Sequence, residues 1–209
     1  MQEEFRMQQL QPELYEEIQK TQGKEGEFGD ILTTTMLHGK FFPQELWTDN
    51  SPYVKYKKEE YLLLKECYEA IWADLVYFPV PSREISFEDG WRKPRDYGGE
   101  RLHEGTDLFG KVEEAGYYPV VSMTDGVVEQ KGWLPLGGYR IGIRSPHGGY
   151  FYYAHLSEYE GDISTGDTVT AGDVLGYMGN TGYGPEGTKG KFPVHLHLGI
   201  YISTPYQEE

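Results

Sequence analysis

Four of the six histidines in this chain, together with one aspartate, fall into three short motifs that could form a metal-dependent catalytic site. The motifs are His103-Glu104-Gly105-Thr106-Asp107, Tyr153-Ala154-His155-Leu156 and His195-Leu196-His197. Two imidazoles and a carboxylate are a ligand set that catalytic zinc prefers, because they leave a fourth position for water. Two further histidines would then remain to act on that water or on the substrate. This order of motifs indicates a zinc hydrolase.

Taken singly, each motif also has a plainer interpretation. The spacing of His195 and His197 places both imidazoles on one face of a strand, where they could be two ligands of one metal or one ligand with a catalytic neighbour. A surface strand would give the same pattern. His103 and Asp107 lie on one side of the backbone in either an extended or a helical segment, and a turn aspartate would account for them equally well. His155 alone fits a hydrogen-bonded histidine at the end of a strand.

The composition excludes several classes of protein. The formal net charge of −15 argues against binding of nucleic acid, because phosphate contacts need clustered Lys and Arg. The single cysteine, Cys67, excludes an intramolecular disulfide. The sequence has no run of 18 apolar residues, so we expect no transmembrane helix. The first residues lack the basic and apolar regions of a signal peptide.

Glycine usage divides the chain into two regions. Before about residue 82 the pattern is helical, with apolar residues at spacings of three and four from Tyr61 to Leu75. Ser51-Pro52 supplies a start signal for this helix and Phe78-Pro79-Val80-Pro81 a stop. A weaker helix is expected around residues 11–21.

After residue 115, brief β-like runs alternate with turns, which is typical of mostly antiparallel β structure. We expect a tight turn at Asp125-Gly126 and a hairpin between Tyr139–Arg144 and Tyr150–Ala154. His147 belongs to the turn of that hairpin. His38 is assigned to a loop.

In this order, the motifs resemble the LytM/lysostaphin-type zinc endopeptidases of the M23 family, over about residues 91–200. The resemblance extends beyond the histidine motifs to five segments in sequence order. These are Gly98–Asp107, Tyr118–Val128, Tyr153–Ser157, Gly166–Gly176 with Gly179–Gly182, and the closing His195–His197.

The resemblance implies a role for each site residue. His103, Asp107 and His197 would hold zinc, and His155 and His195 would be the catalytic pair. Zinc would lower the pKa of its bound water to about 7 and polarise the scissile carbonyl. One histidine of the pair would take the proton of the water, and the other would stabilise the oxyanion or protonate the leaving amine.

The same resemblance implies the organisation and setting of the protein. Residues 83–209 would form the M23-type zinc peptidase domain, a mainly β domain built as an antiparallel β sandwich or half-barrel. Residues 1–82 would form an N-terminal α-helical region packed on it, so that the chain is α+β overall. The expected substrates are peptidoglycan peptides, and the expected location is extracellular or facing the cell wall, with a signal or anchor segment trimmed from this chain.

Two departures from the family pattern bear on specificity. Leu198-Gly199 follows the closing histidines where the family usually has Phe-Glu, and the loop before them is expanded over residues 183–193. We expect this loop to border the substrate groove. Its Lys189 and Lys191 would be solvated or would contact a peptide carboxylate.

Two other functions compete with hydrolysis. The first is a catalytically silent LytM-like scaffold or activator that binds a division or sporulation partner, although members of that kind usually lack a zinc ligand and this chain lacks none. The second is a carrier domain, because the run Gly166-Asp167 to Gly176 also resembles biotinyl and lipoyl domains. Those domains carry a modified lysine in Met-Lys-Met or Asp-Lys, which does not occur here.

Overall fold

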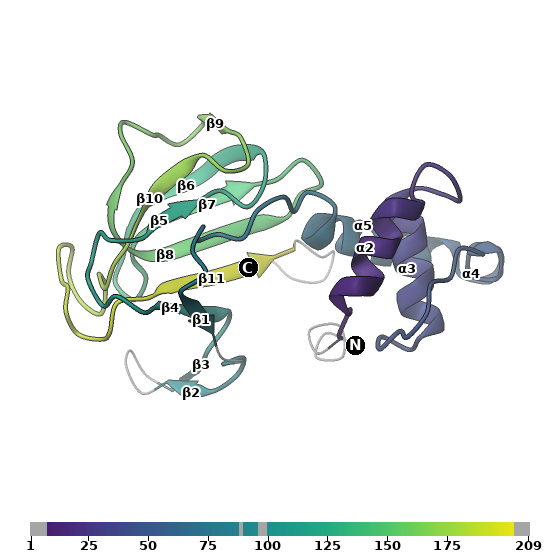
Figure 1. Ribbon diagram of the computed structural model, residues 1–209, viewed down its shortest axis with the longest axis horizontal. Helices are drawn as coiled ribbons and strands as arrows, with labels where there is room; N and C mark the ends of the chain where they lie inside the picture. Colours follow the sequence, from purple (N-terminus) through teal and green to yellow (C-terminus); the bar gives the residue numbers. More distant parts are fainter. Residues whose placement is uncertain (1–7, 88–89, 96–99, 203–209) are drawn as a thin grey trace. The chain divides into compact units, whose positions relative to one another are not determined.

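The computed structural model describes residues 8–87, 90–95 and 100–202, which form two compact units (Figure 1). The first unit spans Met1–Ala73 and the second Asp74–Glu209. Within the described residues, every helix is too short or too polar to cross a membrane.

The first unit is helical and has its own small core. Its helices, in the described part of the chain, are α2 (Pro12–Thr21), α3 (Phe28–His38), α4 (Ser51–Tyr56) and α5 (Lys58–Trp72). The core residues are Ile18, Ile31, Leu32, Met36 and Tyr68. The helix expected around residues 11–21 is therefore confirmed. His38, which was assigned to a loop, is instead the last residue of α3, and its ring stacks on Trp47 with centroids 3.4 Å apart.

The long helix expected after Ser51 differs from the structure in two ways. It is broken at Lys57, whose ψ of 47° leaves the helical region, and it ends at Trp72 rather than at the proline cluster. Leu75 lies beyond the helix end and packs against the core of the second unit. The apolar spacing from Tyr61 to Leu75 thus includes residues of α5 and one residue of the second unit, so it does not mark the end of the helix.

The second unit is built around a sheet of nine strands with antiparallel pairing throughout the described residues. Along the main path the order is β1-β4-β11-β8-β7-β6-β9, and β10 pairs with both β5 and β8. The strands are β1 (Ile85–Phe87), β4 (Thr106–Gly110), β5 (Pro119–Val121), β6 (Gly126–Leu134), β7 (Gly138–Arg144), β8 (Tyr150–Tyr159), β9 (Thr168–Val169), β10 (Val174–Met178) and β11 (Leu196–Tyr201). A separate two-stranded ladder joins β2 (Pro94–Arg95) to β3 (Arg101–Leu102).

One face of the large sheet is packed into the core, and alternation along the strands sends the intervening side chains to the other face. Buried core residues include Ile141 and Ile143 of β7, Phe151 and Tyr153 of β8, and Leu196 of β11. The order β4-β11-β8 places the strands of the three sequence motifs side by side (Figure 1).

The expected turns have different outcomes. The hairpin of Tyr139–Arg144 with Tyr150–Ala154 is confirmed by the pairing of β7 and β8. Asp125 lies just before β6 and Gly126 is its first residue. The strands on either side do not pair with each other, because β5 pairs with β10, and β6 pairs with β7 and β9.

The fold class is confirmed as mainly antiparallel β with N-terminal helices, and the sheet stays open at β1 and β9 rather than closing into a barrel. The expected domain boundary near residue 82 falls inside the second unit. Residues 74–82 join that unit because Val76 donates to Met123 O, Val121 donates to Pro79 O, and Val80 is buried in its core. The packing of the helices on the β domain stays a prediction.

Candidate metal centre

Strand register brings the first and last motifs together. His197 on β11 is the register partner of Asp107 on β4, and of Ala154 on β8. Leu108 and Leu196 point into the core, so alternation turns Asp107 and His197 to the opposite face.

His103 reaches the same place through a bend at Gly105. The φ of Gly105 is +139°, and a Cβ there would lie 2.5 Å from Leu198 O and 2.9 Å from the His197 ring. Only glycine allows this close approach.

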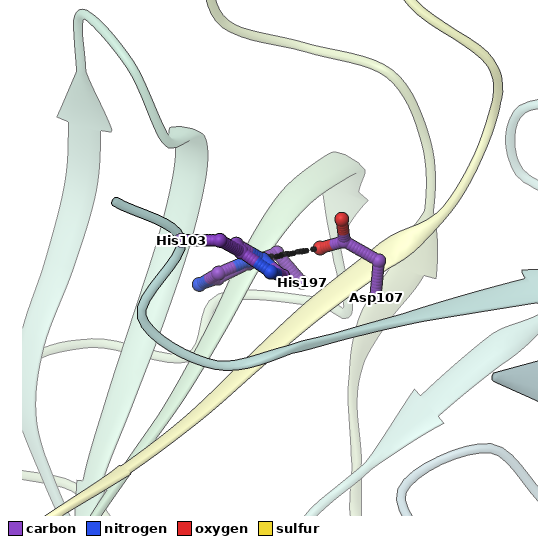
Figure 2. Close-up of side chains that lie close together, drawn as sticks. All are labelled: His103, Asp107 and His197. Carbon is purple, nitrogen blue, oxygen red and sulfur yellow. Dashed lines mark hydrogen bonds and ion pairs between the residues drawn. The ribbon is translucent and has the colours of Figure 1, made fainter. Parts of the chain in front are cut away.

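Three donor atoms converge at this point of the sheet. His103 Nε2 lies 3.0 Å from Asp107 Oδ1 and 3.0 Å from His197 Nδ1, and His197 Nδ1 lies 3.0 Å from Asp107 Oδ1. Figure 2 shows the three side chains directed toward one another. Ligand atoms of a tetrahedral zinc are separated by about 3.3 Å, given metal–ligand distances near 2.0–2.1 Å. The spacing therefore fits one small metal ion.

Protonation also fits a metal. The Nδ1 of His103 lies 3.0 Å from Gly90 O, to which Nδ1–H donates, so a neutral His103 has its lone pair on Nε2. Burial raises the pKa of Asp107, but its contacts with His103 and His197 and the nearby His195 hold that pKa far below its usual range. The unprotonated Nε2 of His103 thus faces the ionised carboxylate of Asp107, and a metal cation between them would bind to both atoms.

Arg95 holds the other oxygen of Asp107. Its Nη2 donates a 2.5 Å hydrogen bond to Oδ2, while Oδ1 faces the two imidazoles. One carboxylate oxygen is thereby kept for the metal position. The sequence analysis missed both Arg95 and the Gly90 carbonyl. In the sequence, only the presence of an arginine shortly before the first motif could have pointed to Arg95. A backbone carbonyl such as that of Gly90 leaves no mark in the sequence.

The other two histidines lie beside the cluster. The rings of His155 and His195 have centroids 4.8 Å apart, and His195 Nε2 lies 3.7 Å from Asp107 Oδ1. In each, Nδ1 is 2.8 Å from a backbone carbonyl, of Thr181 for His155 and of Pro193 for His195. Donation from Nδ1–H leaves the Nε2 lone pair of each neutral ring available.

His155 is held in an unusual state. Its φ of +64° is in the left-handed region, which is uncommon for residues other than glycine and is often found at functional sites. Burial, followed by repulsion from His195 and His197 in their protonated forms, lowers the pKa of His155 to about 3. Burial also lowers the pKa of His195. Both rings are therefore neutral at neutral pH.

The expanded loop of residues 183–193 contacts this pair through Phe192, and its place beside a substrate groove stays a prediction. The ring of Phe192 is 4.5 Å from that of His155 and 5.1 Å from that of His195, and Tyr183 is 4.6 Å from Phe192. Lys189 and Lys191 are exposed.

His147 lies in the β7–β8 turn, as predicted, and its Nδ1 is 2.7 Å from Asp74 Oδ1. This ion pair is separate from the cluster of His103, Asp107 and His197, which is the group of metal-ligand type found among the described residues.

The fold and this cluster define a β-sheet protein with a ligand set suited to a catalytic metal. A sequence profile described as Peptidase family M23 matches residues 101–208, which is more than half of the chain. The chain belongs to peptidase family M23.

Individual relatives agree with this membership. The chain is 46% identical over 143 residues to an L-Ala–D-Glu endopeptidase of Bacillus subtilis (strain 168), covering 68% of this chain and 43% of that protein. It is 33% identical over 110 residues to the glycyl-glycine endopeptidase ALE-1 of Staphylococcus capitis, covering 49% of this chain and 29% of that protein. This chain thus spans less than half the length of either relative.

A solved structure resembles the chain over almost its whole length. The crystal structure of a Ruminococcus gnavus protein, provisionally named a glycyl-glycine endopeptidase LytM, has a TM-score of 0.80 and 42% identity, and covers 99% of this chain and 85% of that one.

Proposed function

We propose that this protein is a zinc metalloendopeptidase that hydrolyses a peptide bond of peptidoglycan. The observation that carries the proposal is the cluster of His103, Asp107 and His197 beside the paired rings of His155 and His195. Membership of family M23 supports a peptidase activity, and relatives named as endopeptidases support peptide cross-links or stems as substrates.

His103, Asp107 and His197 would hold the zinc ion through Nε2, Oδ1 and Nδ1. A zinc ion bound there would lower the pKa of a coordinated water to about 7 and polarise the scissile carbonyl. Gly90 O and Arg95 would keep the ligands His103 and Asp107 in their orientation.

His195 would accept the proton of the attacking water. Its ring is neutral, its Nε2 is free of the proton held at Nδ1, and the positive charge that forms on it lies 3.7 Å from the Asp107 carboxylate. His155 is a weaker base, because burial holds its pKa near 3. We therefore assign proton acceptance to His195 and transition-state contact to His155.

The bond cleaved would be that between L-Ala and D-Glu. The support is the 46% identity to an enzyme named for that bond, against 33% to one named for glycyl-glycine bonds. The test compares synthetic L-Ala–D-Glu, pentaglycine and D-Ala–diamino acid peptides with the zinc-loaded protein. Products from the first peptide alone would support the assignment, and products from pentaglycine alone would contradict it.

We infer that the protein acts outside the cell or facing the wall, where peptidoglycan is found. The scaffold alternative predicts a different result in the same experiment. Folded, zinc-loaded protein that cuts none of these peptides or purified peptidoglycan, yet binds a protein partner, would support a silent LytM-like activator.

A further inference from the structure

The sheet face that carries the metal cluster continues across β8 and β7. The core residues Ile141 and Tyr153 are register partners, so alternation turns Arg140 on β7 and Ala154 and Tyr152 on β8 to the opposite face. This is the face of His197, whose ring lies 6.0 Å from that of Tyr152.

Arg140 lies close to the proposed active site. On the neighbouring strand β8 it lies opposite Ala154 and His155, at the point where the register between β7 and β8 shifts. Ala154 in turn is the partner of His197. Two strand spacings of about 4.8 Å separate Arg140 from His197, which is about 10 Å between backbones. An extended peptide covers that distance in about three residues, at 3.3–3.6 Å per residue.

Among the described residues, Nη1 of Arg140 is one of the buried side-chain atoms that have no hydrogen-bond partner. Arg144, four residues along the same strand, is bonded to both carboxylate oxygens of Glu129 and to Gly148 O. A buried donor without a partner destabilises the folded protein, and a charged one does so more strongly. An anionic ligand would offset this cost.

The surroundings of Arg140 are suited to such a ligand. Tyr150 and Tyr152 lie on the same face. The Tyr150 hydroxyl lies where a Cβ of Gly142 would be, and the Tyr152 hydroxyl where a Cβ of Gly137 would be, so the two phenols reach the β7 segment on either side of Arg140. On the other side, the register partner of Arg140 is Gly132, where a Cβ would meet nothing within 4 Å. Gly132 therefore places no side chain beside Arg140.

The net charge of −15 repels an acidic peptide at long range, so its capture needs a cation at the site itself. A glutamyl residue retains a free carboxylate whichever of its two carboxyl groups forms the next peptide bond. Arginine matches a carboxylate with two parallel N–H donors.

We propose that Arg140, with the phenols of Tyr150 and Tyr152, forms a subsite that binds a free carboxylate of the substrate peptide near the scissile bond. This inference rests on the proposed peptidase function and names a feature of its substrate, an acidic residue such as D-glutamate.

The test uses two peptides that differ only in this group, an L-Ala–D-Glu stem peptide and its analogue with the free D-Glu carboxylate converted to an amide. The wild-type protein should cleave the acid with a KM roughly tenfold below that of the amide. In Arg140→Met the KM for the acid should rise to that for the amide, with kcat within about twofold. Arg140→Lys should recover part of the preference. Arg83→Met, at an exposed arginine of the same unit, is the control and should keep the full preference.

A purely structural role for Arg140 gives a different pattern. It predicts that Arg140→Met lowers the thermal midpoint and affects both peptides alike, which would overturn the subsite. If the protein cleaves neither peptide, the proposed L-Ala–D-Glu specificity fails, and calorimetric binding of the same two peptides still tests the subsite. Tighter binding of the acid that is lost in Arg140→Met supports it, and equal binding of both peptides overturns it.

Discussion

Arg95 Nη2 donates a 2.5 Å hydrogen bond to Asp107 Oδ2, the carboxylate oxygen that does not contact the two imidazoles. The two oxygens of the Asp107 carboxylate therefore have different partners. Oδ2 accepts from Arg95, whereas Oδ1 lies 3.0 Å from both His103 Nε2 and His197 Nδ1. Groups that orient a metal ligand in this way are commonly worth 10–100-fold in affinity or activity.

Replacing Arg95 by Met should therefore weaken zinc binding by roughly tenfold or more, because Asp107 loses the partner that fixes its orientation. Competition with a chromophoric chelator measures the affinity. Arg101→Met is the control, since Arg101 is the ladder partner of Arg95 but bonds to the Tyr183 hydroxyl. Equal losses in the two variants would contradict a specific role for Arg95.

Gly105→Ala should disrupt the metal centre. A Cβ at this position would lie 2.5 Å from Leu198 O and 2.9 Å from the His197 ring, and the φ of +139° is strained for any other residue. We expect loss of stoichiometric zinc, measured by metal analysis after dialysis, and a lower thermal midpoint. Gly187→Ala is the control, because it has a positive φ of 88° but open space around its Cβ position. Full zinc occupancy in Gly105→Ala would show that the bend is not needed.

Phe192→Ala should reduce catalysis without affecting zinc. The Phe192 ring packs on both His155 and His195, so its removal leaves the pair less well positioned. We expect kcat to fall roughly tenfold to a hundredfold with unchanged zinc content. Glu186→Ala, at an exposed position of the same loop, should retain wild-type kcat. An unchanged kcat in Phe192→Ala would place the loop outside the catalytic machinery.

The metal-free protein should lose stability in mild acid because of His155. Its folded pKa of about 3 lies below the unfolded value of about 6.5, so between these values the unfolded state binds more protons and stability falls as pH falls. From pH 6.5 to 5 this one group accounts for about 2 kcal/mol. His155→Asn keeps a residue that tolerates positive φ and removes the titration.

Urea unfolding of both metal-free proteins at these two pH values measures the difference. The wild-type protein should lose about 2 kcal/mol more than His155→Asn. Equal losses would mean that His155 titrates at its ordinary pKa in the folded protein.

Sequence reasoning recovered the parts of this structure that depend on local pattern and motif order. Alternation and turn residues predicted the β7–β8 hairpin, and the three motifs do meet on neighbouring strands. Non-local pairing is beyond such local patterns. The strands before and after Asp125-Gly126, β5 and β6, pair with other strands of the sheet.

Helix α3 was missed because its Thr33-Thr34-Thr35 run has low helix propensity, and burial of Ile31, Leu32 and Met36 overrides that preference. Arg95 and Arg140 were missed for another reason. Nothing in the sequence near either residue tells which strand will lie opposite it, and the role proposed for each depends on that neighbour.

The most direct test of the account is digestion of purified peptidoglycan by the zinc-loaded protein, with and without a chelator, followed by mass spectrometry of the released fragments. We predict new peptide ends at L-Ala and D-Glu that disappear with chelator, return when zinc is added back, and are absent with His197→Ala. Fragments that persist in chelator, or that His197→Ala still releases, would contradict a zinc endopeptidase built on His103, Asp107 and His197.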